Sequence, residues 1–517
     1  MGSLSKALTK VQALIIVLVI AVAAVGGAYL ITQTTMQPTE TTTTTPTTTP
    51  ETTTTPGTTT TPVTTPTTTT PADNQILIGD LALVVPPEFK QFVEAARSGE
   101  VSVKIYFGHA LTQDEFAAFQ QVINMFMQEY PGIEVIPIPY SSMDALKTQI
   151  SAIAALPPEQ RAGFIGNAPD VFTWAHDWIG SFADKGWILD LETYIGAETI
   201  TNYIAPAIQP IAMSAVTYKL KTYGLPYAGE AIALIVNKQL VTTPPTSFSE
   251  MLAIMQQFHN PSAGKYGLSY QFDPYHLYPF ITAFNGYYLD EATGSIGVNS
   301  TGTKDGVKFY IQNILPYLDY SDLGSTNQLN NFLTGKTPMI ITGPWSLPSI
   351  KNSIGLNNIE VVPIPNIDNR IPRPFSGFRN MYISILAASG GIQRTYASVL
   401  FVLYLSLNDN ALKILVENNV YVPVKNSVIQ YVTNNRSQYP VVYGFMQQVL
   451  LRSTPMPKDP NMEKVWGVGT NLNAIVGEFT NAISQGKTVS EAVEAALGVV
   501  DQQLDEAYAT IMESLGG

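Results

Sequence analysis

The side chains most often used in catalysis and metal binding are sparse in this chain of 517 residues. It has no cysteine, which excludes disulfides, thiolate metal sites and cysteine nucleophiles. GxSxG, HExxH and phosphate-binding P-loop motifs are also absent. Histidine occurs four times without a pair at metal-ligand spacing, at His109, His176, His259 and His276. We therefore predict no metal, no cofactor and no catalytic residue.

Aromatic and acidic side chains remain as groups that could recognise a small molecule. A tryptophan ring can stack on an apolar ligand face, although most tryptophans pack in cores or at their rims. A carboxylate can accept charge-assisted hydrogen bonds, although most carboxylates are solvated surface charges. The formal net charge of -13 argues against nucleic acid and is compatible with a neutral ligand. The five tryptophans are Trp174, Trp178, Trp187, Trp345 and Trp466.

Strands that alternate with helices must position these groups. Residues 101–108 read as a buried strand, and residues 114–132 as an amphipathic helix that Pro131-Gly132 ends. Further strands are predicted over 133–140 and 168–177. This pattern predicts an α/β protein with a largely parallel sheet, in which ligands bind beyond the carboxyl ends of the strands. The residues at such ends are His109, Tyr140 and those from Trp174 to Asp177.

The amino-terminal region predicts a membrane anchor. Residues 1–10 hold two lysines and no acid, and residues 11–31 carry no charge. About 20 helical residues span the hydrocarbon core of a membrane, which is about 30 Å thick. A cleaved secretory signal, or pilin-type processing before the apolar run, are the alternatives. We favour a retained anchor, with residues 1–10 in the cytoplasm and everything after Ile31 outside.

Two further segments precede the main globular part. Residues 32–72 consist mainly of threonine and proline, which cannot bury enough surface to offset the entropy of ordering the chain. They predict a disordered stalk of the O-glycosylated type. Residues 73–100 predict a short strand and a helix, an amino-terminal extension to which we assign no function.

Six segments between residues 101 and 510 carry a resemblance to a known family. They are APDVFTWAHDWIGSFADKGWILDLETYI (168–195, preceded by FxxxYPGIEV), LPYAGEAIALIVNKQL (225–240), YGLSYQFDPYHLYPFITAFNGYY (266–288), FLTGKTPMIITGPWS (332–346), YVPVKNSV (421–428) and MPKDPNMEKVW (456–466). In this order they resemble the family 1 extracellular solute-binding proteins of ABC transporters, which include the maltodextrin-binding proteins. The anchor and the Thr-rich stalk resemble those of archaeal members.

The resemblance implies a two-lobed periplasmic-binding-protein fold, type II-like, with crossover strands at a hinge. Lobe 1 would comprise residues 101–228 and 384–420, and lobe 2 residues 229–383 and 421–517. Closure of the lobes about the hinge would trap a ligand between them.

The resemblance also implies a sugar site, where rings stack on sugars and carboxylates bind hydroxyl groups. Trp174, Trp345 and Trp466 match sugar-contacting positions, whereas we assign Trp187 to packing. Trp178 stands where maltodextrin-binding relatives carry arginine. The other matching or neighbouring residues are Asp177, Glu230, Asp273, Tyr275, Tyr278, His109, Tyr140 and Asp144.

Departures from the family pattern leave the exact sugar open. Gly467 replaces an aromatic residue that commonly follows Trp466, and Thr470 lies near a position that is arginine in maltodextrin binders. Val236 stands where a tyrosine is usual. A mono- or oligosaccharide is expected, maltodextrin-like or trehalose-like.

The expected protein is therefore a monomeric, non-enzymatic sugar-binding subunit of an ABC importer. Its partners would be permease subunits with separate ATPases, and the membrane through its amino-terminal helix. Alternatives are the same fold binding a peptide, a polyamine or a metal chelate, a structural cell-wall module, and a surface-anchored glycoside hydrolase that uses a carboxylate pair. Two sequons, at Asn299 and Asn435, are glycosylation candidates compatible with an extracellular location.

Overall fold

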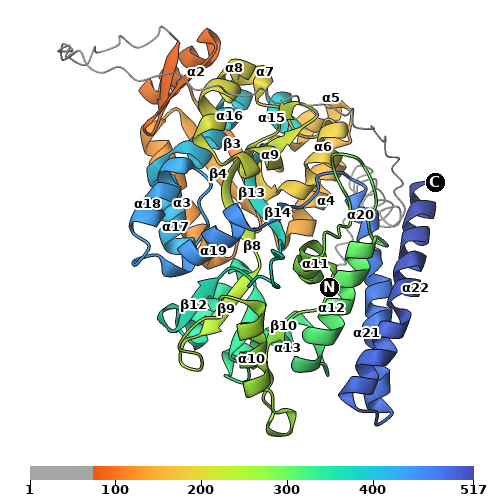
Figure 1. The fold of residues 1–517 in the computed structure, drawn as a ribbon. Coiled ribbons are helices and arrows are strands. Elements are labelled where there is room, and N and C mark those ends of the chain that lie inside the picture. The colour runs from red at the N-terminus through yellow and green to blue at the C-terminus, as the bar shows by residue number, and fades with distance from the viewer. Residues whose placement is uncertain (1–73, 517) are drawn as a thin grey trace, which may run out of the picture.

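The chain folds into two α/β lobes, each built around one main sheet (Figure 1). The computed structural model describes residues 74–516. The predicted two-lobed α/β architecture is confirmed. The predicted cytoplasmic end, membrane anchor and stalk, residues 1–72, lie outside the described residues.

The larger lobe contains a six-stranded mixed sheet. Its elements are β3 (Val103–His109), α3 (Gln113–Glu129), β4 (Ile133–Pro139), α4 (Met143–Ala154), β5 (Val171–Ala175), α6 (Ile179–Asp184), α9 (Pro210–Val216), β8 (Leu225–Ala231), β13 (Phe375–Ile383), α16 (Ile392–Leu407), α17 (Asp409–Asn419), α18 (Asn426–Asn434), α19 (Pro440–Leu451) and β14 (Thr454–Pro455). The strand order is β14-β13-β5-β3-β4, and β8 also pairs with β13. β3 runs parallel to β4 and β5, whereas β13 runs antiparallel to β5 and β8.

Local sequence explains why these elements form. Val103, Ile105 and Phe107 alternate into the core from β3, as a strand with buried faces requires. α3 begins with a capping box, in which Thr112 and Glu115 each satisfy a backbone N–H of the other. Because β3 runs parallel to both β4 and β5, the carboxyl ends of these three strands meet at one edge of the sheet.

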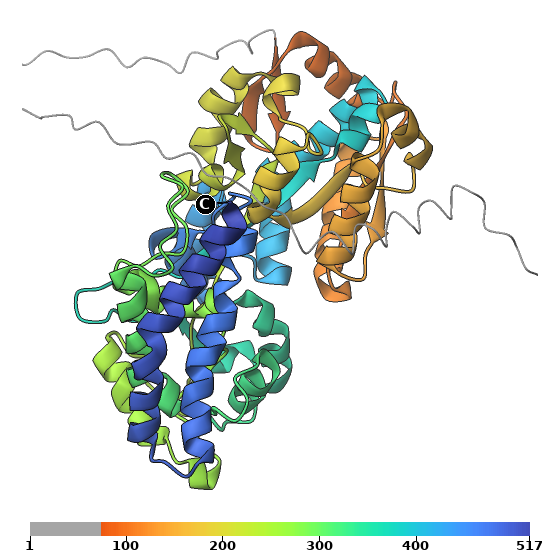
Figure 2. The same ribbon diagram turned by 90° about the vertical axis from the view of Figure 1, so that its right-hand side faces the viewer.

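The smaller lobe contains a four-stranded sheet covered by helices. Its elements are β9 (Ala233–Asn237), α10 (Phe248–Phe258), β10 (Ser269–Tyr270), α11 (Pro274–Ala283), α12 (Thr301–Asn313), α13 (Ser325–Leu333), β11 (Met339–Thr342), α14 (Leu347–Ser353), β12 (Ile359–Val362), α20 (Met462–Val465), α21 (Val468–Ser484) and α22 (Val489–Leu515). The strand order is β10-β11-β9-β12. Figure 2 shows α21 and α22 as a long hairpin along one side of this lobe.

Three connections join the lobes. Ile232 alone separates β8 of the larger sheet from β9 of the smaller one, and residues 363–374 lead from β12 back to β13. The last connection follows β14 and reaches α20. α19 packs on both β8 and β12, and its Gly444 permits this because a Cβ there would lie 2.1 Å from the carbonyl oxygen of Val361.

The boundaries expected at 384 and 421 differ from these connections. β13 already belongs to the larger sheet, because ladders to β5 and β8 hold it on both sides. Residues 421–434 also lie with the larger lobe, since Val422 pairs with Gly229 and α18 contacts α17. The expected exit near 228 lies within β8, close to the observed crossover at Ile232.

Residues 74–98 pack on the larger lobe as β1 (Gln75–Ile78), β2 (Leu81–Val84) and α2 (Pro87–Ser98). Phe89 of α2 meets Tyr396 of α16 edge to face at 5.3 Å, and Arg97 pairs with Glu129 of α3 at 2.9 Å. Within residues 74–516, no single helix is long and apolar enough to cross a membrane. α16 and α17 reach that length together, but they are bent by 61° at their junction and residues 397–407 are buried.

Candidate ligand-binding site

A cavity of about 490 Å³ lies on the smaller lobe beside α11 and the start of α21. Four predicted ligand residues from three separate segments come together in its wall: Asp273, Tyr275, Trp345 and Trp466. The remaining lining residues are Pro274, His276 and Gly469.

Trp345 offers the most accessible ring of this cavity, with 43% of the residue exposed. It follows β11 through the Gly343-Pro344 turn, and its ring folds back over Gly343. A Cβ at position 343 would lie 2.2 Å from the ring, so glycine is needed for this placement. Its ring centre lies 6.3 Å from that of Tyr275. A ring that is supported by the backbone at Gly343 and exposed to solvent is suited to stacking on a ligand.

Two other predicted aromatic residues differ from each other in exposure. Trp466 follows α20, lines the cavity and packs edge-on against Phe375 at 5.9 Å. Tyr278 instead stacks face to face on Phe375 at 3.5 Å and is 3% exposed. The structure therefore places Tyr278 in the core behind the cavity and not in its wall.

Asp273 caps the amino terminus of α11. Its Oδ1 accepts a hydrogen bond from the backbone N–H of His276 at 2.8 Å, and Nδ1 of His276 lies 2.9 Å from Oδ2. The side-chain amide of Gln271 also donates to Oδ2. Burial alone would raise the pKa of Asp273, but these hydrogen bonds hold it below its ordinary value. Both oxygens of this predicted ligand residue are thus engaged within the protein.

The larger lobe contributes a charged cluster. Arg379 of β13 donates from Nε to Oε2 of Glu230 at 2.8 Å and from Nη1 to Oε1 of Glu115 at 3.1 Å. Nη1 also donates to the hydroxyl of Tyr421 at 2.9 Å. Burial alone would raise the pKa of Glu115, but Arg379 and hydrogen bonds from Thr112 and Tyr421 lower it. Glu230, a predicted ligand residue, is therefore held by a cation on the neighbouring strand.

Three predicted residues lie where strands β3, β4 and β5 end. Oδ1 of Asp177 is buried without a hydrogen-bond partner, and burial raises the pKa of this carboxyl to about 6. The hydroxyl of Tyr140 is also buried and unpartnered. His109 stacks on Phe116 at 4.2 Å, and burial lowers its pKa to about 4, so it is neutral at pH 7. Tyr140 and Asp177 therefore each hold a buried polar atom that makes no hydrogen bond among the described residues, which is uncommon in folded proteins.

The aromatic half of the candidate site belongs to the smaller lobe and the charged half to the larger lobe. Burial is the main cause that raises the pKa of Tyr275 on the smaller lobe, and the carboxylates of Glu230, Asp273 and Asp177 add to it. Lys147 of α4 also pairs with Glu463 of α20 at 3.2 Å, which links the two lobes.

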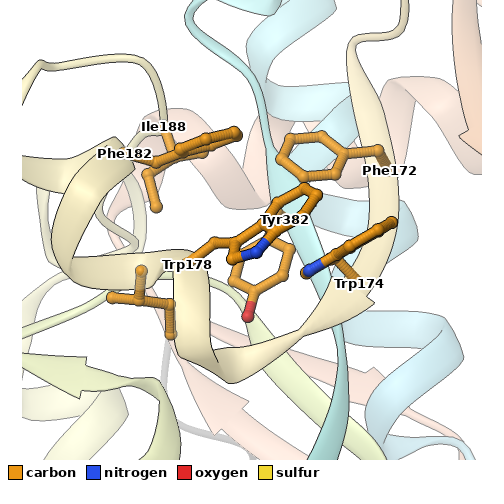
Figure 3. A pocket seen from close by; sticks show the side chains of 7 residues that line it. Phe172, Trp174, Trp178, Phe182, Ile188 and Tyr382 are labelled. Atoms are coloured by element: carbon orange, nitrogen blue, oxygen red, sulfur yellow. The ribbon is translucent and has the colours of Figure 1, made fainter. Parts of the chain in front are cut away.

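Trp174 and Trp178 form a separate aromatic cluster on the larger lobe, shown in Figure 3. Their rings stack at 3.5 Å, and Lys147 Nζ lies 4.2 Å from the Trp178 ring centre. The pocket that they line has a free volume of only about 10 Å³, about enough for one water molecule. The other lining residues are Phe172, Ile179, Phe182, Ile188 and Tyr382.

The remaining predicted residues lie apart from this cavity. Asp144 is exposed in the first turn of α4, and Trp187 packs edge to face on Phe182 at 5.4 Å. The side-chain amides of the sequon residues Asn299 and Asn435 donate to Asp505 and to the carbonyl of Tyr431. Among the described residues, no group of three or more metal-binding side chains could hold an ion.

The sequence reasoning missed two residues that the structure brings into the site, Arg379 and His276. Arg379 interrupts the apolar strand FSGFRNMYI, and a charge in such a strand requires a partner, which was a readable signal. His276 lies 4% exposed in the cavity wall and is oriented by Asp273. Its position three residues after an Asp-Pro helix start was the available signal.

Comparison with known proteins gives consistent matches. The sequence profile of the family described as bacterial extracellular solute-binding protein matches residues 109–411. The maltotriose-binding protein of Pyrococcus abyssi is 33% identical over 373 residues, or 71% of this chain and 76% of that protein. The maltodextrin-binding protein of Bacillus subtilis is 25% identical over 375 residues, or 70% and 83%. A solved structure of a cyclo/maltodextrin-binding protein complexed with maltotetraose has a similar fold, with a TM-score of 0.63, 24% identity and coverage of 80% and 97%.

Proposed function

Because this chain belongs to the bacterial extracellular solute-binding protein family, we propose that it captures a carbohydrate outside the cytoplasm for an ABC importer. The family membership expected from six sequence segments is thereby confirmed. Maltooligosaccharides are the ligand class that we propose, since the two relatives above are named for maltotriose and maltodextrin. We propose binding without hydrolysis, because those relatives are named as binding proteins.

One observation carries this proposal, the cavity walled by Trp345, Tyr275 and Trp466. Sugar rings have apolar C–H faces and polar rims, so they suit a site that combines aromatic rings with a few polar groups. The volume of about 490 Å³ lies within the range of about 300–1,000 Å³ that is usual for ligand sites.

Carboxylates of the larger lobe would supply the hydrogen bonds. Glu230 has one oxygen without a hydrogen bond among the described residues, and Oδ1 of Asp177 is also unpartnered. An ionised carboxylate accepts strong hydrogen bonds from neutral hydroxyl groups. A neutral polyol therefore fits this half of the site better than an anion, which the carboxylates would repel. Tyr140 and His109, at neighbouring strand ends, are further candidates for polar contacts.

Closure of the lobes would enclose the ligand. Ile232 alone links the two sheets at the first crossover, and α19 packs on strands of both lobes, so a hinge at this place is supported. The closed form would dock on a permease, and separate ATPase subunits would supply energy because this chain lacks a P-loop. Residues 11–31 would hold a monomeric receptor at the membrane, and this anchor would raise its local concentration near the transporter.

The test is a titration of the full chain, solubilised in a detergent without a sugar headgroup because a maltoside headgroup would compete. Maltose, maltotriose, trehalose, glucose and cellobiose are followed by tryptophan fluorescence and calorimetry, with chromatography of the sugars afterwards. We expect saturable 1:1 binding, tightest for maltotriose, and unchanged sugar. Binding of none of the five would move the ligand to a peptide, a polyamine or a chelate. Sugar breakdown would favour the glycoside hydrolase.

A further inference from the structure

We propose that Arg379 is a further recognition residue, which holds the carboxylate of Glu230 in place and binds two neighbouring hydroxyl groups of the ligand together with it. This inference rests on the proposed carbohydrate function. It assigns a role to a residue of β13, a strand from which no polar contact was expected.

The contact between the two side chains leaves one atom of each available. Nε of Arg379 donates to Oε2 of Glu230 at 2.8 Å, but among the described residues Oε1 of Glu230 and Nη2 of Arg379 make no hydrogen bond. Each side chain is 20% exposed, so both remain accessible. A hydroxyl group can donate to the free oxygen while its neighbour accepts from the free nitrogen. An acceptor and a donor side by side are the groups that adjacent hydroxyls of a sugar ring require.

A second arginine pair of the same lobe shows what a structural ion pair looks like here. Arg394 donates from Nε to Oδ1 of Asp170 at 2.7 Å, and its Nη2 lies 2.7 Å from Oδ2. Both oxygens of that carboxylate are used, and the Asp170 side chain is fully buried. In the Arg379–Glu230 pair, by contrast, one carboxylate oxygen and one guanidinium nitrogen make no hydrogen bond among the described residues. Its unused donor and acceptor are therefore not explained by packing alone.

The far side of Arg379 is fixed by a second layer. Glu115 and the Tyr421 hydroxyl bind Nη1, and the Tyr421 hydroxyl donates to Oε1 of Glu115 at 2.9 Å. Thr112 holds the other oxygen of Glu115 at the start of α3. Two carboxylates share one guanidinium, so the cluster keeps one net negative charge. That charge leaves Glu230 with surplus capacity to accept hydrogen bonds.

Backbone geometry keeps the free oxygen of Glu230 open. Gly377 of β13 is its partner across the ladder, and a Cβ there would lie 3.1 Å from Oε1. Glu230 is also the second-last residue of β8, directly before the crossover. The pair therefore stands next to the crossover between the lobes.

The experiment is a double-mutant cycle on maltotriose affinity, measured by calorimetry with the full chain. Arg379→Met leaves two carboxylates without a cation and could unfold, so the main variant is Arg379→Met with Glu115→Gln, which keeps the net charge of the cluster. We expect about 10- to 100-fold weaker binding, the effect of losing a charge-assisted hydrogen bond. In a protein that already carries Glu230→Gln, the same two substitutions should weaken maltotriose binding by less than about threefold, because Arg379 acts together with Glu230. The single variant Arg379→Lys should keep only part of the parent's affinity for maltotriose, since an ammonium group lacks the planar fork of a guanidinium.

The matched control is Arg97→Met, which removes an exposed arginine pair on the same lobe and should bind like the parent. Parent-like binding by the Arg379→Met/Glu115→Gln variant would overturn this inference while the carbohydrate function stands. An equal loss with and without Glu230 would also overturn it, because that result means a purely structural role. A parent that binds no sugar would overturn the proposed function itself, and this inference with it.

Discussion

Two tryptophan pairs of this protein have opposite surroundings. Trp174 and Trp178 stack on each other on the larger lobe, and Trp174 is 8% exposed beside a void of about 10 Å³. Trp345 and Trp466 line a cavity of about 490 Å³ on the smaller lobe, and Trp345 is 43% exposed. The same residue type fills space in one lobe and surrounds it in the other.

The difference follows from what lies behind and in front of each ring. Trp174 belongs to the central strand β5 and is enclosed by Phe172, Phe182 and Tyr382. Trp345 follows β11, an inner strand of the smaller sheet, through the turn at Gly343, and it remains exposed although Tyr275 and His276 lie beside its ring. Hydrophobic enclosure therefore makes Trp174 part of the stability of its lobe, and exposure makes Trp345 available to a ligand, whereas Trp178 and Trp466 are both half-buried.

The largest expected effect is on stability, for Trp174→Ala. Truncation of a buried tryptophan should lower the free energy of unfolding by about 3–5 kcal/mol, through lost burial and the cavity left behind. Chemical denaturation followed by far-UV circular dichroism measures it. Trp345→Ala is the matched variant, and it should lose less than about 1 kcal/mol. The comparison would be broken if Trp174→Ala were as stable as the parent and lost only sugar affinity.

The next effect is on affinity, for Trp345→Ala. Loss of a well-placed aromatic platform should weaken sugar binding by about 1–3 kcal/mol, or about 5- to 150-fold in Kd. Calorimetric titration with maltotriose measures this change, and Trp187→Phe serves as a control away from the cavity. If Trp345→Ala bound every sugar as tightly as the parent, the cavity assignment would be wrong.

Sequence reasoning predicted several strands correctly, and three of its predicted aromatic residues line one cavity. The strands expected at 101–108 and 133–140 correspond closely to β3 and β4, because a period of two with buried apolar residues is a local signal. Trp345, Trp466 and Tyr275 meet in one cavity, as family positions implied.

Other parts of the site depended on distant partners that local patterns do not reveal. Tyr278 stacks on Phe375, which is almost one hundred residues away, so its sequence gave no sign that the ring faces the core. The engagement of Asp273 was more readable, because Asp followed by Pro at a helix start is a common cap. The lobe boundaries near 384 and 421 were displaced because strand pairing, and not local sequence, assigns β13 to its sheet.

The third prediction concerns the pH dependence of sugar affinity. A fall in pH should weaken the contribution of the charged half of the site but not that of the aromatic half. Burial raises the pKa of Asp177 to about 6, so this carboxyl takes up a proton as the pH falls below that value. If hydroxyl groups bind its ionised form, affinity should fall about tenfold between pH 7 and pH 5, whereas stacking on Trp345 does not change.

Calorimetry at several pH values measures this slope, and Asp177→Asn should be flat over the same range. Protonation of Asp177 does not destabilise the folded state, so it cannot weaken sugar binding by unfolding the protein. Its folded pKa lies above the ordinary value of 3.8, so its contribution to stability grows as the pH falls from 6 towards 4. Circular dichroism at each pH checks that the chain stays folded. Equal slopes for the parent and Asp177→Asn would remove Asp177 from the site.

The smallest effect concerns Lys147, which lies over Trp178 of the first tryptophan pair and joins the lobes. Its Nζ lies 4.2 Å from the ring centre of Trp178 and pairs with Glu463 at 3.2 Å, with side chains 30% and 60% exposed. Lys147→Met should weaken sugar binding by about 0.2–1 kcal/mol, because an exposed pair contributes little to holding the lobes together. High salt should remove the same increment from the parent, and Lys147→Glu combined with Glu463→Lys should regain it. Tighter binding by Lys147→Met would instead mean that the uncovered ring of Trp178 stacks on the sugar, and the two tryptophan pairs would then act alike.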